Sequence, residues 1–159
     1  MRRANARVVI GVALLVRALV DAHPGAAQGD ADARAAEAVI LRQLEAFRNG
    51  DFDTAYTFAA ASIQQTFDRL AFERMVTTGY PEIAHSAFAL VSKNEQASDG
   101  RRYVTVRILG VNGRRIEALY EMVREDGAWK ISGVVTKPDT GFVSRRQGSA
   151  APLGAYRAS

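Results

Sequence analysis

The chain has 159 residues, 48% of them hydrophobic, which is enough for one folded domain with a core and short terminal extensions. Its formal charge is +4, but the basic excess lies in the two ends of the chain, and residues 29–137 are close to neutral. This distribution argues against a nucleic-acid-binding face, and the absence of cysteine excludes disulfides and zinc–thiolate sites.

The N-terminal segment has the pattern of a Sec-type signal peptide. Arginines within positions 2–7 precede a short apolar run at 8–16, and small residues at 25–27 offer a cleavage site after Ala27. The apolar run is shorter than the ~20 residues that a membrane span needs. The pattern predicts export to the periplasm or the medium, with no membrane span left after cleavage. An uncleaved N-terminal anchor and a wrongly assigned start are the alternatives.

The first half of the remaining chain has the apolar spacing of helices. Apolar residues three and four apart predict a helix over 32–48 that Asn49-Gly50 ends. The same spacing predicts a shorter helix over 51–61 and a third over 68–78, for which Asp68 is the N-cap. The sequence thus predicts three helices before any strand.

The second half of the chain alternates in the manner of β-strands. The predicted strands are residues 86–93, 102–111, 114–124 and 128–137. Helices followed by an antiparallel meander predict an α+β fold. From residue 138 the composition turns to Gly, Ser, Ala, Pro and Arg without a period, which is typical of a disordered tail. The predicted organisation is a signal peptide (1–27), one α+β domain (28–137) and a disordered tail (138–159).

Two dipeptides, Asn112-Gly113 and Asp126-Gly127, predict two-residue type I′ hairpin turns between the last three strands. Such turns fix which residues share a face of the sheet, because side chains alternate along a strand. On this register the core-facing set is Tyr103, Thr105, Arg107, Leu109, Ile116, Ala118, Tyr120, Met122, Trp129 and Ile131. The opposite face then carries Val104, Val106, Ile108, Leu119, Val123 and Val134 among Glu117, Glu121, Lys130 and Ser132. That face is more apolar than a solvated face needs to be, so it predicts a dimer face, for which β-branched strand propensity is the alternative explanation.

Three helices followed by a curled meander that ends in Gly127, Trp129 and Ile131 resemble the nuclear transport factor two-like superfamily, which includes the SnoaL-like proteins. More narrowly, residues 34–137 are similar to an uncharacterised bacterial family known only as a domain of unknown function. The residues that carry this resemblance are Ile40, Gln43 to Phe47, Asp51, Ala55-Tyr56, Phe58-Ala59, Ala61 to Ile63, Phe67, Phe72, Met75-Val76, Gly79 to Pro81, Ala118 to Tyr120 and Gly127 to Ile131. The resemblance implies a cone-shaped domain, three helices on a curved four-stranded antiparallel sheet, usually preceded by a signal peptide. It implies no activity, because the superfamily hosts isomerases, cyclases, dehydratases, binding modules and assembly domains.

The candidate ligand-binding residues are Arg107, Tyr120 and Tyr56. On the predicted inner face, Arg107 would meet an anionic ligand, or it would be a rim residue with its charged head in water. The two tyrosines would supply hydroxyls to a pocket, or they would only pack in the core. No acidic residue falls on the predicted inner face, which counts against the tyrosine–acid chemistry of the superfamily's isomerases.

His85 is the one histidine left after removal of the signal peptide, and it would serve as a base or simply begin a strand. One histidine and no cysteine make a transition-metal site improbable, and phosphate-binding glycine loops are absent, so no metal or cofactor is predicted. The leading hypothesis is an exported, non-enzymatic binding or assembly module that forms a homodimer. The alternative is an isomerase- or cyclase-like enzyme, or a carrier of a small, anionic ligand, with a partly polar cavity between the first helix and the sheet.

Overall fold

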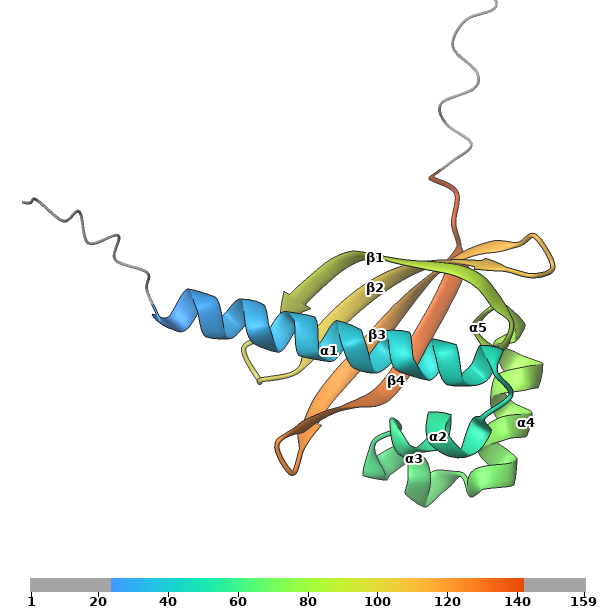
Figure 1. Ribbon diagram of the computed structural model, residues 1–159, viewed down its shortest axis with the longest axis horizontal. Coiled ribbons are helices and arrows are strands. Elements are labelled where there is room, and N and C mark those ends of the chain that lie inside the picture. The colour runs from blue at the N-terminus through green and yellow to red at the C-terminus, as the bar shows by residue number, and fades with distance from the viewer. Residues whose placement is uncertain (1–23, 142–159) are drawn as a thin grey trace, which may run out of the picture.

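Within residues 24–141, a long helix crosses one face of a curved four-stranded sheet, and four short helices continue that layer at one end of the molecule (Figure 1). The computed structural model describes residues 24–141. The helices are α1 (Pro24–Arg48), α2 (Phe52–Thr57), α3 (Ala61–Thr66), α4 (Arg69–Gly79) and α5 (Pro81–Ala84), and the strands are β1 (Ser86–Gln96), β2 (Arg102–Gly110), β3 (Arg115–Glu125) and β4 (Ala128–Pro138). The sheet is an antiparallel meander in the order β1-β2-β3-β4.

The predicted α+β class is confirmed: helices lie on a four-stranded antiparallel sheet, an arrangement consistent with the cone-shaped fold. The described residues form five helices in place of the predicted three. The predicted helix over 51–61 ends at Thr57 because the chain there joins the sheet: the Ala60 N–H donates to the Ile131 carbonyl at 2.8 Å. The added α5 is a single turn that begins at Pro81, a residue whose fixed φ suits the first position of a helix.

Most of the predicted signal peptide, residues 1–23, lies outside the described residues. Most of the predicted tail, residues 142–159, lies outside them as well. α1 begins at Pro24, so the predicted cleavage after Ala27 falls in its first turn. Within residues 24–141, no helix is both long enough and apolar enough to span a bilayer.

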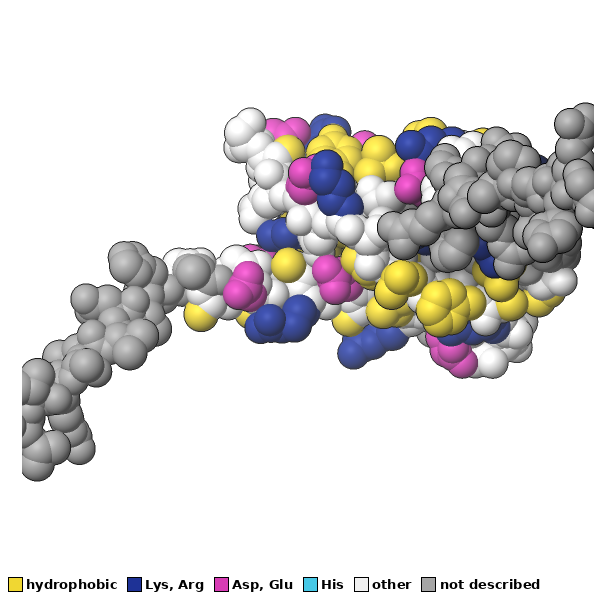
Figure 2. Space-filling view, turned by 90° about the horizontal axis from the view of Figure 1, so that it is seen from above, with side chains coloured by type: hydrophobic (Ala, Val, Ile, Leu, Met, Phe, Trp, Pro, Cys, Tyr) yellow, Lys and Arg dark blue, Asp and Glu magenta, His cyan; other side chains and the backbone are white. Residues whose placement is uncertain are grey.

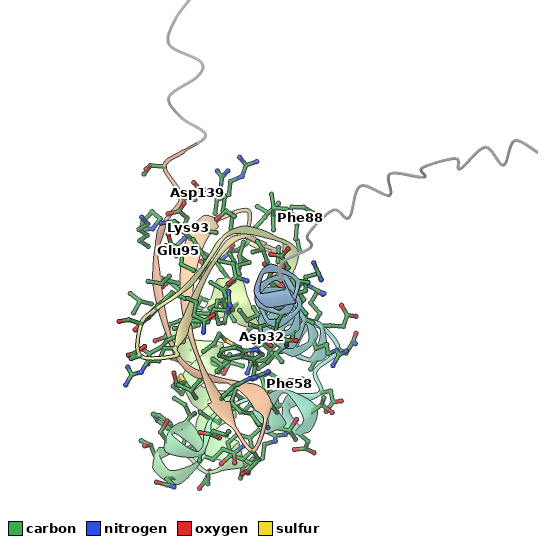
Figure 3. All side chains as sticks on the ribbon, turned by 90° about the vertical axis from the view of Figure 1, so that its left-hand side faces the viewer. Asp32, Phe58, Phe88, Lys93, Glu95 and Asp139 are labelled. Atoms are coloured by element: carbon green, nitrogen blue, oxygen red, sulfur yellow. The ribbon has the colours of Figure 1, made fainter. Side chains whose placement is uncertain are left out.

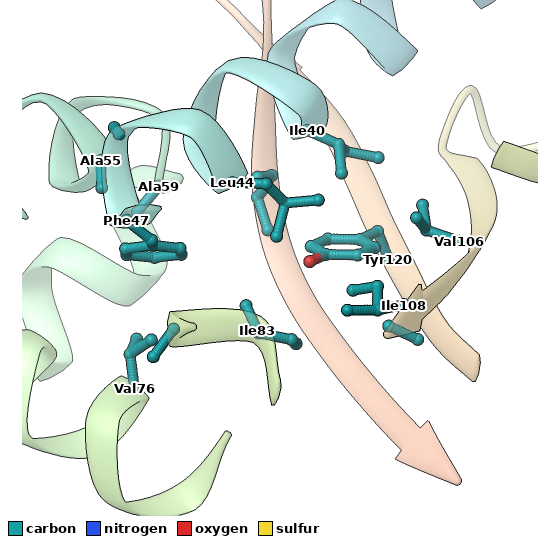
Figure 4. Close-up of a cluster of buried hydrophobic side chains, with 14 of the residues drawn as sticks. Ile40, Leu44, Phe47, Ala55, Ala59, Val76, Ile83, Val106, Ile108 and Tyr120 are labelled. Atoms are coloured by element: carbon teal, nitrogen blue, oxygen red, sulfur yellow. The ribbon is translucent and has the colours of Figure 1, made fainter. Parts of the chain in front are cut away.

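The core lies between α1 and the concave face of the sheet. Ile40 and Leu44 of α1 are fully buried and face Tyr120 of β3, and Phe47 continues the same helical stripe toward α4 (Figure 4). Burying such side chains is the main favourable contribution to the stability of the domain. This packing also positions the sheet, because α1 covers one of its faces and leaves the other open.

A polar cluster fastens the middle of α1 to the sheet. Arg102 is buried and lies over the Trp129 ring at 5.7 Å, and its guanidinium donates to Asn94 Oδ1 at 2.8 Å. The Asn94 amide in turn donates to the Glu37 carboxylate of α1 at 2.8 Å. Because the cluster joins β1, β2 and β4 to α1, we interpret it as structural.

The turn between β2 and β3 differs from the predicted two-residue type I′ turn. Gly110 pairs with Arg114, and the Gly113 N–H donates to the Gly110 carbonyl at 2.9 Å, which makes a three-residue loop. Gly113 has φ of +78°, whereas Asn112 keeps a negative φ. This is a turn followed by a glycine bulge, the second common way of closing a hairpin.

The longer loop moves the β2–β3 register by one residue and exchanges the faces of β2. The prediction of which β2 side chains face the core was therefore wrong. Val104, Val106 and Ile108 point into the core with exposed fractions of 0%, 0% and 2%. The residues that point to the open face instead are Tyr103, Thr105, Arg107 and Leu109.

The turn between β3 and β4 is confirmed as the predicted type I′ turn. Asp126 and Gly127 have φ of +49° and +79°, and the Met122–Ile131 and Arg124–Trp129 pairs form as predicted. Further along β4 a bulge at Ser132 shifts the register, so that Tyr120 faces Val134 rather than the predicted Gly133. Val134 consequently packs against the core and not on the opposite face.

Candidate functional site

The open face of the sheet is the candidate functional site. It lies on the side away from α1, where Lys93 and Glu95 project from β1 (Figure 3). Four large apolar side chains remain exposed on this face: Phe88 at 59%, Leu90 at 53%, Leu119 at 42% and Val135 at 71%. Seen from above, hydrophobic side chains gather in the right half of the molecule among basic and acidic ones (Figure 2). Exposed apolar groups on one face indicate an interaction surface.

The middle of this face is hollowed over all four strands. We call this depression, of about 480 Å3, the central hollow; its lining is Ser92, Lys93, Thr105, Glu117, Leu119, Val135, Thr136 and Lys137. Leu119 and Val135 pair directly across β3 and β4 and form an apolar patch inside it. The charges around the patch are paired, Lys137 with Glu117 and Lys93 with Glu95, both at 2.9 Å. The central hollow therefore combines an apolar patch with a balanced rim.

A second depression, the edge hollow, lies at the end of the same face where β1 begins. It has a volume of about 290 Å3 and is lined by Phe88, Leu90, Arg107, Ile108, Leu109, Arg115 and Asp139. Arg107 donates from Nε and Nη2 to Asp139 Oδ2, at 2.9 and 2.7 Å. This ion pair ties the chain that follows β4 back onto β2.

Asp139 is held as a carboxylate by its neighbours. Its side chain is only 5% exposed. The hydrogen bond from Arg107 lowers the pKa of this carboxyl below its ordinary value, and the Gly141 N–H, which donates to Asp139 Oδ1 at 3.0 Å, acts in the same direction against the effect of burial. The edge hollow is thus apolar on one side and bounded by a fixed ion pair on the other.

A small cavity lies where the C-terminal end of α1 and the short helices meet the sheet. Its volume is about 60 Å3, and it is bounded by aromatic and aliphatic side chains together with Gln43, Tyr80 and Tyr120. The Gln43 amide donates a hydrogen bond to the Ala55 carbonyl, at 3.1 Å. The Tyr120 hydroxyl is buried with no hydrogen-bond partner among the described residues, and it points toward Leu44, Phe47 and Ile83 (Figure 4). Burial raises the pKa of Tyr120 well above its usual value, so the hydroxyl stays protonated.

Replacing Tyr120 with phenylalanine should raise the free energy of unfolding by about 1 kcal/mol, because it removes a buried donor that has no partner within residues 24–141. The matched control is Tyr56→Phe, which should lower it by about 1 kcal/mol, because the Tyr56 hydroxyl donates to the Phe67 carbonyl at 2.6 Å. Urea unfolding of both variants provides the measurement. A loss of stability in Tyr120→Phe would mean that a water or ligand satisfies that hydroxyl.

The structure does not bring the three predicted ligand residues together. Tyr120 lines the inner cavity, Arg107 lies on the opposite face of the sheet, and Tyr56 hydrogen-bonds the chain between α3 and α4. Arg107 was predicted to face inward, and the one-residue register shift explains the error. His85 is exposed, and its carbonyl accepts the Val111 N–H.

Of the predicted dimer face, only Leu119 lies on the open side of the sheet. Val104, Val106 and Ile108 are core residues, and Val134 packs against the core. The exposed apolar residues that replace them are Phe88, Leu90 and Val135. Alternation along β1 is the sequence signal for the first two, whereas Val135 emerges only because of the bulge in β4.

Comparison with known proteins places this domain in a family. Residues 29–143 match the model described as "Domain of unknown function (DUF4864)". The chain belongs to that family. The DUF4864 match extends from α1 to two residues beyond the described part of the chain, so it includes all four strands, both hollows and Asp139.

No protein of curated function matches this DUF4864 chain. Among solved structures, it is similar to Aln2 from a Streptomyces species, at 18% sequence identity and a TM-score of 0.46. The similarity covers 69% of this chain and 91% of the Aln2 chain.

Proposed function

We propose that this DUF4864 protein is an exported, non-enzymatic assembly module that pairs with a second copy of itself through the open face of its sheet. The observation that carries the proposal is the exposed apolar patch of the central hollow, formed by Leu119 and Val135 on a face that none of the helices within residues 24–141 covers. Covering such a patch with a second copy would remove apolar surface from water.

Charge pairing on the open face favours a second copy as the partner. In a two-fold symmetric dimer the same patch meets itself, so a face with one net sign of charge would repel its copy. Here the charges around the central hollow have opposite partners within the chain, in the Lys137–Glu117 and Lys93–Glu95 pairs. The apolar residues of the central hollow therefore lie among charges that are balanced within the chain.

The small volume of the inner cavity supports a non-enzymatic role. A cavity that takes a small-molecule substrate commonly has about 300 Å3 or more, whereas the cavity between α1, the short helices and the sheet has about 60 Å3. Within the described residues, the polar side chains that line this space are Gln43, Tyr80 and Tyr120, all of them uncharged. The space is better suited to core packing than to the positioning of a substrate.

Substitutions in the central hollow test the dimer. Leu119→Lys should weaken dimerisation at least about tenfold, because it places two new charges against each other across the interface. The matched control is Leu70→Lys, the same change at a 62% exposed leucine on α4, in the helical layer. Sedimentation velocity over a concentration series measures both. Equal effects of the two substitutions would place the interface elsewhere.

A carrier of one small ligand in the inner cavity is the second candidate function. The observation that favours it is the buried Tyr120 hydroxyl, which has no hydrogen-bond partner in the part of the chain that the structure describes. Such a ligand would accept the hydroxyl proton in place of a protein group. Arg107 and Tyr56 would take no part, because they lie outside this cavity. The change in the free energy of unfolding of Tyr120→Phe, compared with that of Tyr56→Phe, shows whether the Tyr120 hydroxyl has a bound hydrogen-bond partner.

The export part of the proposal rests on the N-terminal pattern and on two further observations. The DUF4864 match begins at Gly29, just beyond the predicted cleavage after Ala27. The side chains described over residues 25–31 are all exposed, so cleavage would remove only an overhanging first turn of α1. We expect the mature protein in the periplasm or medium to begin at Gln28, and N-terminal sequencing of the secreted fraction checks this. Recovery of the full-length chain from the cytoplasm alone would overturn it.

A further inference from the structure

The chain that follows β4 is fastened to the open face up to the last described residue. The Asp139 N–H donates to the Arg115 carbonyl at 3.0 Å, and the Asp139 carboxylate holds Arg107. The Gly141 N–H then returns to that carboxylate at 3.0 Å. These contacts join residues 139–141 to the rim of the edge hollow, which Arg107, Arg115 and Asp139 help to line.

Gly141 itself stands at this rim. A first side-chain carbon at its position would lie 3.4 Å from Arg107 Nη2 and 3.2 Å from Asp139 Oδ1. Beside it, Phe88 and Leu90 expose more than half of their side chains in the edge hollow. The described chain therefore ends next to an apolar depression of about 290 Å3.

The next two residues of the sequence are Phe142 and Val143, and Ser144, Arg145 and Arg146 follow. Two extended residues span about 7 Å, so both apolar side chains are within reach of the edge hollow. The DUF4864 match also runs through Val143, which includes this apolar pair and stops before the basic residues.

We propose that Phe142 and Val143 occupy the edge hollow of their own chain and cover Phe88 and Leu90. Attachment at Gly141 gives these side chains an effective concentration that a separate molecule would have to match by mass action. Arg145 and Arg146 then leave the hollow and enter water, as their charge requires. This packing is independent of the proposed dimer, which uses the central hollow, so either can fail without the other.

Nuclear Overhauser effects on the mature protein test the packing directly. Contacts are expected between the Phe142 ring protons and the methyl groups of Leu90 and Leu109, within one molecule. A sample that mixes labelled and unlabelled chains separates contacts within a chain from contacts between chains. Contacts only between chains would show that a second copy covers the edge hollow, and the lack of any contact would show that Phe142 does not enter it. Both results overturn the proposal.

A substitution gives an independent readout. Phe142→Ala should shift the methyl resonances of Leu90 and Leu109 by removing a nearby ring, and it should leave those of Leu119 in place. Tyr156→Ala is the matched control, because it removes an aromatic ring from the same tail far beyond the hollow. Shifts at Leu90 that are equal in the two variants, or absent from both, would contradict the proposal.

Discussion

Val106→Asp should unfold the domain or lower its free energy of unfolding by at least about 3 kcal/mol. Val106 is fully buried on the concave face, so an aspartate there would be an uncompensated buried charge in a protein whose total stability is of the order of 5 to 15 kcal/mol. The free energy of unfolding comes from urea titration followed by circular dichroism.

The neighbouring residue supplies the control, because alternation along β2 places it on the open face. Thr105→Asp should fold and lose no more than about 1 kcal/mol. The type I′ turn that the sequence predicts would reverse this order and make Thr105 the sensitive position. Equal tolerance of both substitutions would contradict the observed register.

The second large effect is expected in α1. Leu44→Ala should lower the free energy of unfolding by about 2 to 5 kcal/mol, because Leu44 is fully buried between α1 and the sheet and its truncation leaves a cavity. Leu41→Ala, the same change at a leucine that is 41% exposed on the same helix, should cost about 0.5 kcal/mol or less. Chemical denaturation measures both, and similar losses in the two variants would mean that α1 does not pack as described.

The two hairpins show how far the sequence alone predicts this fold. Asp126-Gly127 forms the expected type I′ turn, because both residues take a positive φ. Asn112-Gly113 is the same kind of dipeptide but does not form a type I′ turn. In the structure, this turn contacts α5 and the residue that follows it. The Asn112 amide donates to the Glu82 carboxylate at 3.1 Å, and the Val111 N–H donates to the His85 carbonyl at 2.9 Å.

Close packing at Gly110 belongs to the same contact. A first side-chain carbon on Gly110 would lie 2.7 Å from Asn112 Oδ1 and 3.0 Å from the Glu82 side chain. The contacts with Glu82 and His85 join residues far apart in the chain, and α5 was absent from the predicted elements. A rule based on the turn dipeptide alone therefore could not predict which of the two turns forms.

A shift of one residue in the β2–β3 register changed which residues make up the candidate site. Because the side-chain period of a strand is two, the longer turn moved Arg107 from a supposed ligand pocket to the open face and sent Val106 into the core. β3 was predicted correctly, so Tyr120 and Leu119 lie on the faces expected of them. Asp139 was assigned to the tail and so was missed, although its carboxylate pairs with Arg107 of β2.

The central claim, a dimer through the open sheet face, is tested most directly by the mass of the mature protein in solution. Light scattering on residues 28–159 over a wide concentration range should give twice the mass of one chain at high concentration, and Leu119→Lys should reduce it to the mass of a single chain. The mass of a single chain for the unmodified protein at every concentration would contradict the claim.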